Sequence, residues 1–254
     1  VVERQPRRVT LTGAGGKVVE RARRLLLEAD AIVELAKMDR DPLAGVLRLA
    51  LIPTVGPYLL PHVVRRLKRE LPRLKLMLYE HQTAPLLEKL RAGEIDMGIL
   101  ALPVPLDGLE AETLYDEAFT LAVPAGHRLA DQERVRVDDL KGETLLLLED
   151  GHCLRDQALE VCSRIRVQEE QDYRATSLET LRQMVAAGHG VTLMPQLAAE
   201  SPVGGARGMR TKAFVRPAPT RTIGAVWRKS TTRALAIAAT ANTIRAAMKE
   251  ESKR

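Results

Sequence analysis

The sequence lacks several features that would place it in common protein classes. No apolar run approaches the ~20 residues of a membrane span, and no secretory hydrophobic region stands near the start. Two cysteines in 254 residues are too few for a disulfide framework, so a reducing cytoplasm is the expected location. Repeats and low-complexity tracts are absent. An initiator methionine is absent too, and the chain opens within a strand-like pattern, so we expect a missing upstream segment.

What is present fits a globular protein with an uneven charge. Charged residues make up 28% and hydrophobic residues 45%, which is ordinary for one large domain or two small ones. The net charge is +6, yet residues 1–24 alone hold seven Arg and Lys against two Glu. Such a basic end favours a nucleic-acid partner, although an arginine-rich, solvated surface helix explains the same charges.

The pattern predicts a long amphipathic helix over residues 12–38, preceded by a short strand over 7–12. Thr12 is the expected N-cap. Apolar residues recur at spacings of four and three, as in a coiled-coil seam. The seam comprises Val18, Ala22, Leu25, Ala29, Ile32 and Ala36. A second copy of the helix is the expected partner for it, and packing onto the chain's own globular part is the alternative.

Beyond a linker near residue 42, strands and helices alternate. The expected strands are 46–52, 74–79, 95–100, 119–123, 144–148, 172–174, 191–194 and 221–227. The expected helices are 58–70, 83–92, one beginning at Cys153, 177–187 with a capping box over 176–179, and 232–249. This order predicts an α/β fold of two lobes, with the chain crossing near 118 and returning near 222. Ligands of such folds bind in the cleft, where Thr54, Thr83, Cys153 and Thr176 stand at strand-to-helix junctions.

The two cysteines are the most informative residues. Cys153 is expected where a buried strand ends and a helix begins, and Cys162 follows nine residues later. A continuous helix of that length rises about 13 Å, whereas a disulfide needs Cα atoms within about 7 Å. The pair can therefore bond only if the segment refolds, as in a redox switch. Two unrelated core cysteines are the alternative.

The residues beside Cys153 suggest a reactive thiol. A helix N-terminus together with His152 and Arg155 is expected to lower its pKa and favour the thiolate. Peroxide would oxidise that thiolate to a sulfenic acid, which condenses with a second thiol, and Cys162 is the obvious one. Two Cys and one His at this spacing match no zinc pattern, so no metal is expected.

Three motifs carry a resemblance to the LysR-type transcriptional regulators, and within them to the peroxide-sensing members. They are residues 151–158 (GHCLRDQA) with Cys162, 174–182 (RATSLETLR) and 52–58 (IPTVGPY). The resemblance covers essentially the whole chain. It implies a two-lobed regulatory domain of the type 2 periplasmic-binding-protein kind, preceded by a long dimerisation helix. One departure is Asp172, where a relative carries His.

The resemblance also divides the chain. Residues 1–40 match the wing of a winged helix-turn-helix domain plus the linker helix. Residues 41–117 and 223–254 match regulatory subdomain I, and 118–222 match the redox-active subdomain II. The Gly-rich stretch 201–208 matches poorly, and we expect a loop without chemistry there.

The resemblance implies a function and its residues. Cys153 would be the peroxidatic and Cys162 the resolving cysteine, while Thr54, Thr83, His152 and Arg221 would form the peroxide pocket. Cofactors are not expected. The implied partners are hydrogen peroxide, promoter DNA bound through the missing N-terminal domain, RNA polymerase, and further copies in a dimer or tetramer, with no membrane. A thiol peroxidase and a solute-binding regulator or transporter subunit with bystander cysteines are the alternatives. The basic end and the seam favour a regulator.

Overall fold

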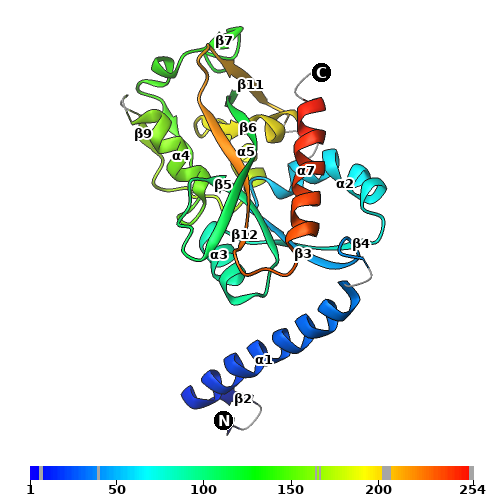
Figure 1. Cartoon of the computed structure of the whole chain (residues 1–254). Helices are drawn as coiled ribbons and strands as arrows, with labels where there is room; N and C mark the ends of the chain where they lie inside the picture. The colour runs from blue at the N-terminus through cyan, green and yellow to red at the C-terminus, as the bar shows by residue number, and fades with distance from the viewer. Residues whose placement is uncertain (6–7, 39–40, 164, 166, 202–206, 252–254) are drawn as a thin grey trace.

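The N-terminal segment stands apart from the body of the molecule. The computed structural model describes residues 1–5, 8–38, 41–163, 165, 167–201 and 207–251. A hairpin of β1 (Val2–Gln5) and β2 (Arg8–Leu11) leads into helix α1 (Gly13–Met38), which projects away from the remainder (Figure 1). Thr12 is the N-cap, as predicted, because its Oγ1 accepts a hydrogen bond of 2.9 Å from the Gly15 amide.

The described residues of the predicted α1 seam are exposed. Leu25 and Ile32 keep 72% and 67% of their surface exposed, and Val18 is exposed as well. The alternative that the seam packs onto the chain's own globular part is therefore wrong. An apolar face of this length needs a cover in water.

The first lobe is built on a parallel sheet, as predicted. Its elements are β3 (Gly45–Leu51), α2 (Gly56–Glu70), β4 (Leu74–Glu80), α3 (Thr83–Ala92), β5 (Met97–Leu102) and the C-terminal α7 (Ala234–Glu251). Strand β3 pairs in parallel with β4 on one side and β5 on the other. Helix α3 ends where Gly93 takes a left-handed conformation, with φ of 81°.

Two long strands pass from the first lobe into the second. Strand β6 (Leu109–Pro124) and β12 (Thr220–Arg228) pair antiparallel and extend the sheet in the order β4-β3-β5-β12-β6. The far end of β6 then pairs with β10 and β11 in the second lobe. The sequence predicted only 119–123 of β6, because its first half is alternately polar and lacks an apolar run.

The second lobe carries the cysteines. Its elements are β7 (Arg134–Val135), the 3-10 helix η1 (Val137–Leu140), β8 (Thr144–Leu145), α4 (Cys153–Cys162), β9 (Gln168–Glu169), α5 (Leu178–Ala186), β10 (Thr192–Pro195), α6 (Gln196–Glu200) and β11 (Met209–Phe214). The two-lobed α/β architecture is thus confirmed.

Three local predictions in this lobe are wrong. The strand expected over 144–148 is regular only at Thr144–Leu145, and Leu148 makes a single bridge with Ala175. No strand forms over 172–174, because the partner of β8 is β9, at Gln168–Glu169. The N-cap of α5 is Ser177, which accepts from the Thr180 amide, so the N-cap lies one residue later than the expected Thr176. Of the expected loop 201–208, residues 202–206 lie outside the described residues.

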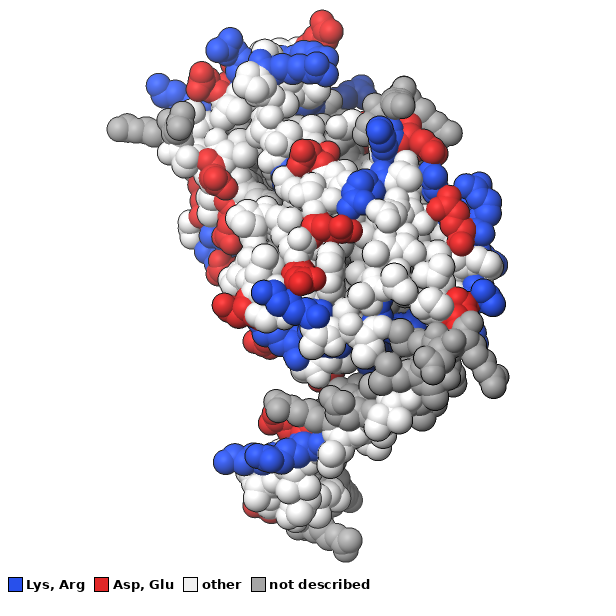
Figure 2. All heavy atoms as spheres, in the orientation of Figure 1, with Lys and Arg blue, Asp and Glu red and all other residues white. Residues whose placement is uncertain are grey.

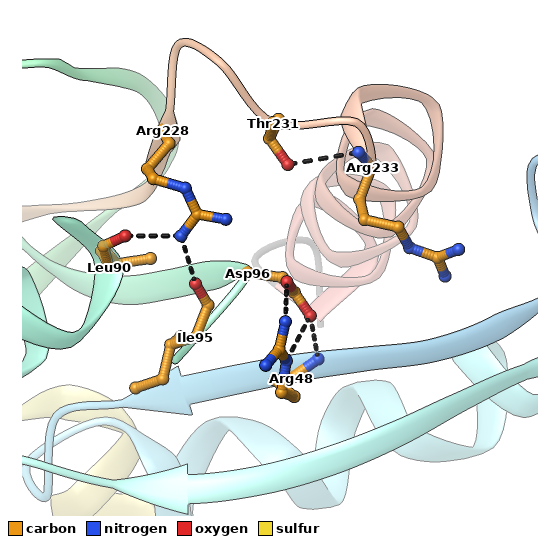
Figure 3. Close-up of polar contacts among 7 residues, drawn as sticks. All are labelled: Arg48, Leu90, Ile95, Asp96, Arg228, Thr231 and Arg233. Carbon is orange, nitrogen blue, oxygen red and sulfur yellow. Dashed lines mark hydrogen bonds and ion pairs between the residues drawn. The ribbon is translucent and has the colours of Figure 1, made fainter. Parts of the chain in front are cut away.

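Polar contacts hold the base of the first lobe together (Figure 3). Arg48 of β3 binds both carboxylate oxygens of Asp96, and Arg228 of β12 donates to the carbonyls of Leu90 and Ile95. These bonds close the C-terminal end of α3 against the sheet.

Surface charge on the face of Figure 2 is mixed. Basic side chains gather around β7 and β11, and acidic ones lie among basic ones elsewhere. No helix among the described residues is both long and apolar enough to cross a bilayer.

Candidate functional site

The cysteines occupy the two ends of one unbroken helix. Cys153 is the first residue of α4 and Cys162 the last, and both are free thiols. The helix between them rises about 13 Å, so the predicted separation holds. Cys162 is only 2% exposed, and burial raises its pKa to about 11. Cys162 is therefore a protonated core residue in this conformation.

Cys153 faces a pocket between the lobes. The pocket has a volume of about 890 Å³, and its walls come from α3 and β5 of the first lobe and α4 of the second. Cys153, Thr83, Ala101, Phe119 and Gln157 are among the residues that line it. The structure thus brings Cys153 and Thr83 together, as the resemblance implied.

Two polar atoms in this pocket have unused hydrogen-bonding capacity. Gln157 Oε1 is buried and makes no hydrogen bond with the described residues, and the buried Thr83 Oγ1 has only the Cys153 thiol beside it among them as a partner. Such atoms are costly unless a ligand or water satisfies them. Gln157 was missed in the sequence, although its spacing of four residues from Cys153 puts both on the same side of the helix.

The pKa of the Cys153 thiol is shifted in the direction opposite to the prediction. Burial raises the pKa of the thiol, while the positive charge of Arg221, the Thr83 hydroxyl and a backbone hydrogen bond to Ala101 act in the opposite direction. The net direction is upward, so the predicted lowering is wrong. Desolvation outweighs these lowering interactions because the thiol is largely shielded from water in the pocket wall.

Neither predicted cation is among the main influences on the thiol pKa. Burial lowers the pKa of His152, which keeps the imidazole neutral near pH 7. The Arg155 guanidinium binds Asp150 at 2.9 Å and Glu169 at 2.7 Å, so its charge is compensated on the other side of the helix. Arg221 takes their place.

Arg221 lies behind the pocket wall in a buried network. Its Nη2 is 2.7 Å from Glu117 Oε2, and the two side chains are 1% and 3% exposed. The same guanidinium donates to Thr54, at 3.1 Å to the hydroxyl and 2.9 Å to the carbonyl. Glu117 also accepts from the Leu197 amide at 3.0 Å. The network joins β12, β6 and α6 where the lobes meet.

His152 lies beside the pocket and not in its lining. Its side chain is 4% exposed, and Nε2 lies 4.0 Å from Glu149 Oε1. The imidazole also hydrogen-bonds to the backbone of Thr176, another predicted junction residue. Asp172 is exposed in a turn, where its amide bonds the Glu170 side chain. The described residues hold no cluster of His, Cys, Asp and Glu suited to a metal ion.

Comparison with known proteins agrees with this geometry. Residues 40–249 match the family model described as the LysR substrate binding domain. The chain is 45% identical over 228 residues to the DNA-binding transcriptional dual regulator OxyR of Escherichia coli (strain K12), covering 90% of this chain and 74% of that protein.

Solved structures give the same result. The oxidized form of OxyR superposes with a TM-score of 0.74 at 44% identity, over 82% of this chain and 98% of that one. A peroxide-bound cysteine mutant of Corynebacterium glutamicum OxyR superposes with a TM-score of 0.76 at 35% identity, over 98% and 80%. Since both the family model and these relatives span most of its length, the chain belongs to the OxyR group of LysR-type transcriptional regulators, which are not enzymes.

Proposed function

We propose that this chain is the regulatory part of a hydrogen-peroxide sensor that reads peroxide through Cys153. The observation that carries the proposal is the pair of free thiols at the two ends of α4, one facing a pocket that Thr83 also lines. The Cys153 thiolate attacks one peroxide oxygen, the O–O bond breaks, and the departing hydroxide takes a proton to leave as water. Cys162 then displaces the second oxygen as water and forms the disulfide.

Disulfide formation has to unfold α4. The helix keeps the sulfurs too far apart, and Cys162 must leave the core, where Leu154 and Ala158 of the same helix are also buried. These apolar side chains then change their burial. Packed interfaces tend to have two discrete arrangements, so the local change can rotate one subunit against another and alter DNA binding.

One experiment tests the sensing step directly. After one equivalent of H2O2, mass spectrometry should find a Cys153–Cys162 disulfide within one chain, without continued turnover of peroxide. Hydrogen exchange should rise most over residues 153–162, where the helix melts. A reduced protein after treatment, or equal exchange in both states, would remove the basis for the proposal.

Four further residues are proposed to support the reaction. Thr83 holds the peroxide directly, since its hydroxyl lies close enough to the thiol to lower its pKa and has no other hydrogen-bond partner among the described residues. Thr54 and Arg221 act from behind the wall, and neutral His152 packs beside Cys153.

Thr83→Val is expected to slow oxidation of Cys153 by about 10²–10³-fold, the usual cost of losing one donor to a developing oxyanion. Thr83→Ser keeps the hydroxyl and is the matched control, with a rate close to wild type. The measurement is stopped-flow oxidation by H2O2 under excess peroxide. A change of less than about threefold, or ~0.65 kcal/mol of barrier, would leave Thr83 as a simple helix-start residue.

The exposed seam of α1 is proposed to hold two chains together. Leu25→Asp combined with Ile32→Asp puts charges into a coiled-coil interface, and we expect a species of lower mass in analytical ultracentrifugation. Glu20→Gln on the same exposed helix serves as a control with unchanged mass. Unchanged mass in the double variant would assign the oligomer to the regulatory lobes.

The remaining assignments complete the proposal. Residues 1–40 are the wing and linker helix, 41–117 with 223–254 form subdomain I, and 118–222 form subdomain II. The protein acts in the cytoplasm as a homo-oligomer, binds promoter DNA through a preceding domain, and contacts RNA polymerase to control antioxidant genes.

A further inference from the structure

A side chain from the first lobe reaches across to the loop that precedes Cys153. Gln82 immediately precedes Thr83, and its Nε2 donates a hydrogen bond of 3.3 Å to Glu149 Oε1 of the second lobe. Glu149 is followed by Asp150, Gly151, His152 and Cys153. One amide therefore joins the strand-to-helix junction that carries Thr83 to the junction that carries Cys153.

The same amide lies directly over the backbone of Gly151. A Cβ built on Gly151 would lie 2.9 Å from Gln82 Oε1 and 3.4 Å from its Cδ. Gly151 also has φ of 94°, a conformation that other residues rarely adopt. The Gln82 side chain therefore packs closely against the backbone of the loop before Cys153, at a glycine where a larger residue would meet it.

Glu149 connects this contact to His152. Glu149 Oε1 accepts from Gln82 and lies 4.0 Å from His152 Nε2, a buried nitrogen without a hydrogen bond in the described part of the chain. Displacing Glu149 would therefore move a carboxylate that lies beside His152.

We propose that Gln82 is a positioning residue for the peroxide reaction, which sets the separation between the Thr83 hydroxyl and the Cys153 sulfur by holding Glu149 and Gly151. The inference rests on the proposed function of Cys153. It assigns a role to a residue that does not line the pocket. Thr83 and Cys153 come from different lobes, so their separation depends on how the two lobes are held together. A misplacement of about 1 Å can cost about 10²-fold in rate.

Gln82→Ala should slow Cys153 oxidation by about tenfold or more. The protein should remain folded, because the Gln82 side chain makes no cap hydrogen bond to α3. In a Gln82→Ala background, Thr83→Val should cost less than about fivefold, since the hydroxyl is already out of place. A purely structural role would leave the cost of Thr83→Val the same in both backgrounds.

A donor–acceptor exchange provides the rescue. Gln82→Glu alone sets two carboxylates against each other and should be slow, whereas Gln82→Glu with Glu149→Gln restores an amide-to-carboxylate bond and should return to within about threefold of wild type. Tyr58→Phe is the matched control, because it removes the 2.8 Å hydrogen bond to Glu179, another contact between the lobes. Its rate should stay near wild type.

The outcomes separate the two claims. If Gln82→Ala reacts within threefold of wild type, if the exchange gives no rescue, or if Tyr58→Phe is equally slow, the positioning role is wrong and the peroxide sensor stands. If wild-type Cys153 does not react with H2O2, the proposed function fails, and this inference fails with it.

Discussion

Cys153→Ser is expected to abolish the fast reaction with H2O2, the largest effect of any single replacement in this protein. A serine hydroxyl does not ionise near neutral pH, and Cys162 cannot substitute because it is buried with its pKa raised to about 11. Peroxide consumption by the wild type and the variant, followed in stopped flow, measures the loss. Equal rates in the two proteins would show that Cys153 is not the residue that reacts with peroxide.

Cys162→Ser should give the complementary result. Cys153 still reacts, but without a second thiol its sulfenic acid persists and can be trapped by a carbon nucleophile and identified by mass spectrometry.

Because burial raises the pKa of Cys153, its oxidation rate should increase as the pH rises toward that elevated value. A rate that is flat from pH 6 to 9 would mean that the thiolate is already fully formed.

Arg221→Met is expected to have the second largest effect, on both stability and reactivity. Removing the guanidinium leaves the Glu117 carboxylate buried without its charge partner, which typically costs about 3–5 kcal/mol. It also removes the positive charge that opposes the rise in the Cys153 pKa, so the pKa rises further and less thiolate forms at neutral pH. Urea unfolding and the pH dependence of the rate measure the two effects.

A double variant separates them. Arg221→Met with Glu117→Leu removes both charges and should recover most of the stability, since apolar replacements of buried pairs are often neutral. It should not recover the rate, because the thiolate still lacks its cation. Recovery of the rate together with stability would show that Arg221 acts only through folding.

The order of strands and helices, and the position of Cys153, followed from local sequence. Apolar spacing predicted α1, and Thr12 marked its start. Short apolar runs predicted the parallel strands. These features depend on backbone preferences and side-chain periodicity within a few residues, which a single sequence displays. The shortest strands, such as β9, were not predicted, because such strands depend on pairing with a segment that is distant in the sequence.

The ionisation at the site was decided only by tertiary structure. The sequence predicted His152 and Arg155 as the cations that act on Cys153. Burial instead keeps His152 neutral, and the carboxylates of Asp150 and Glu169 bind Arg155. Arg221 acts on Cys153 because β12 returns between the lobes, and Gln82 meets Glu149 because the lobes close there. Charge and desolvation act through space, so the residues that tune a thiol need not adjoin it in the chain.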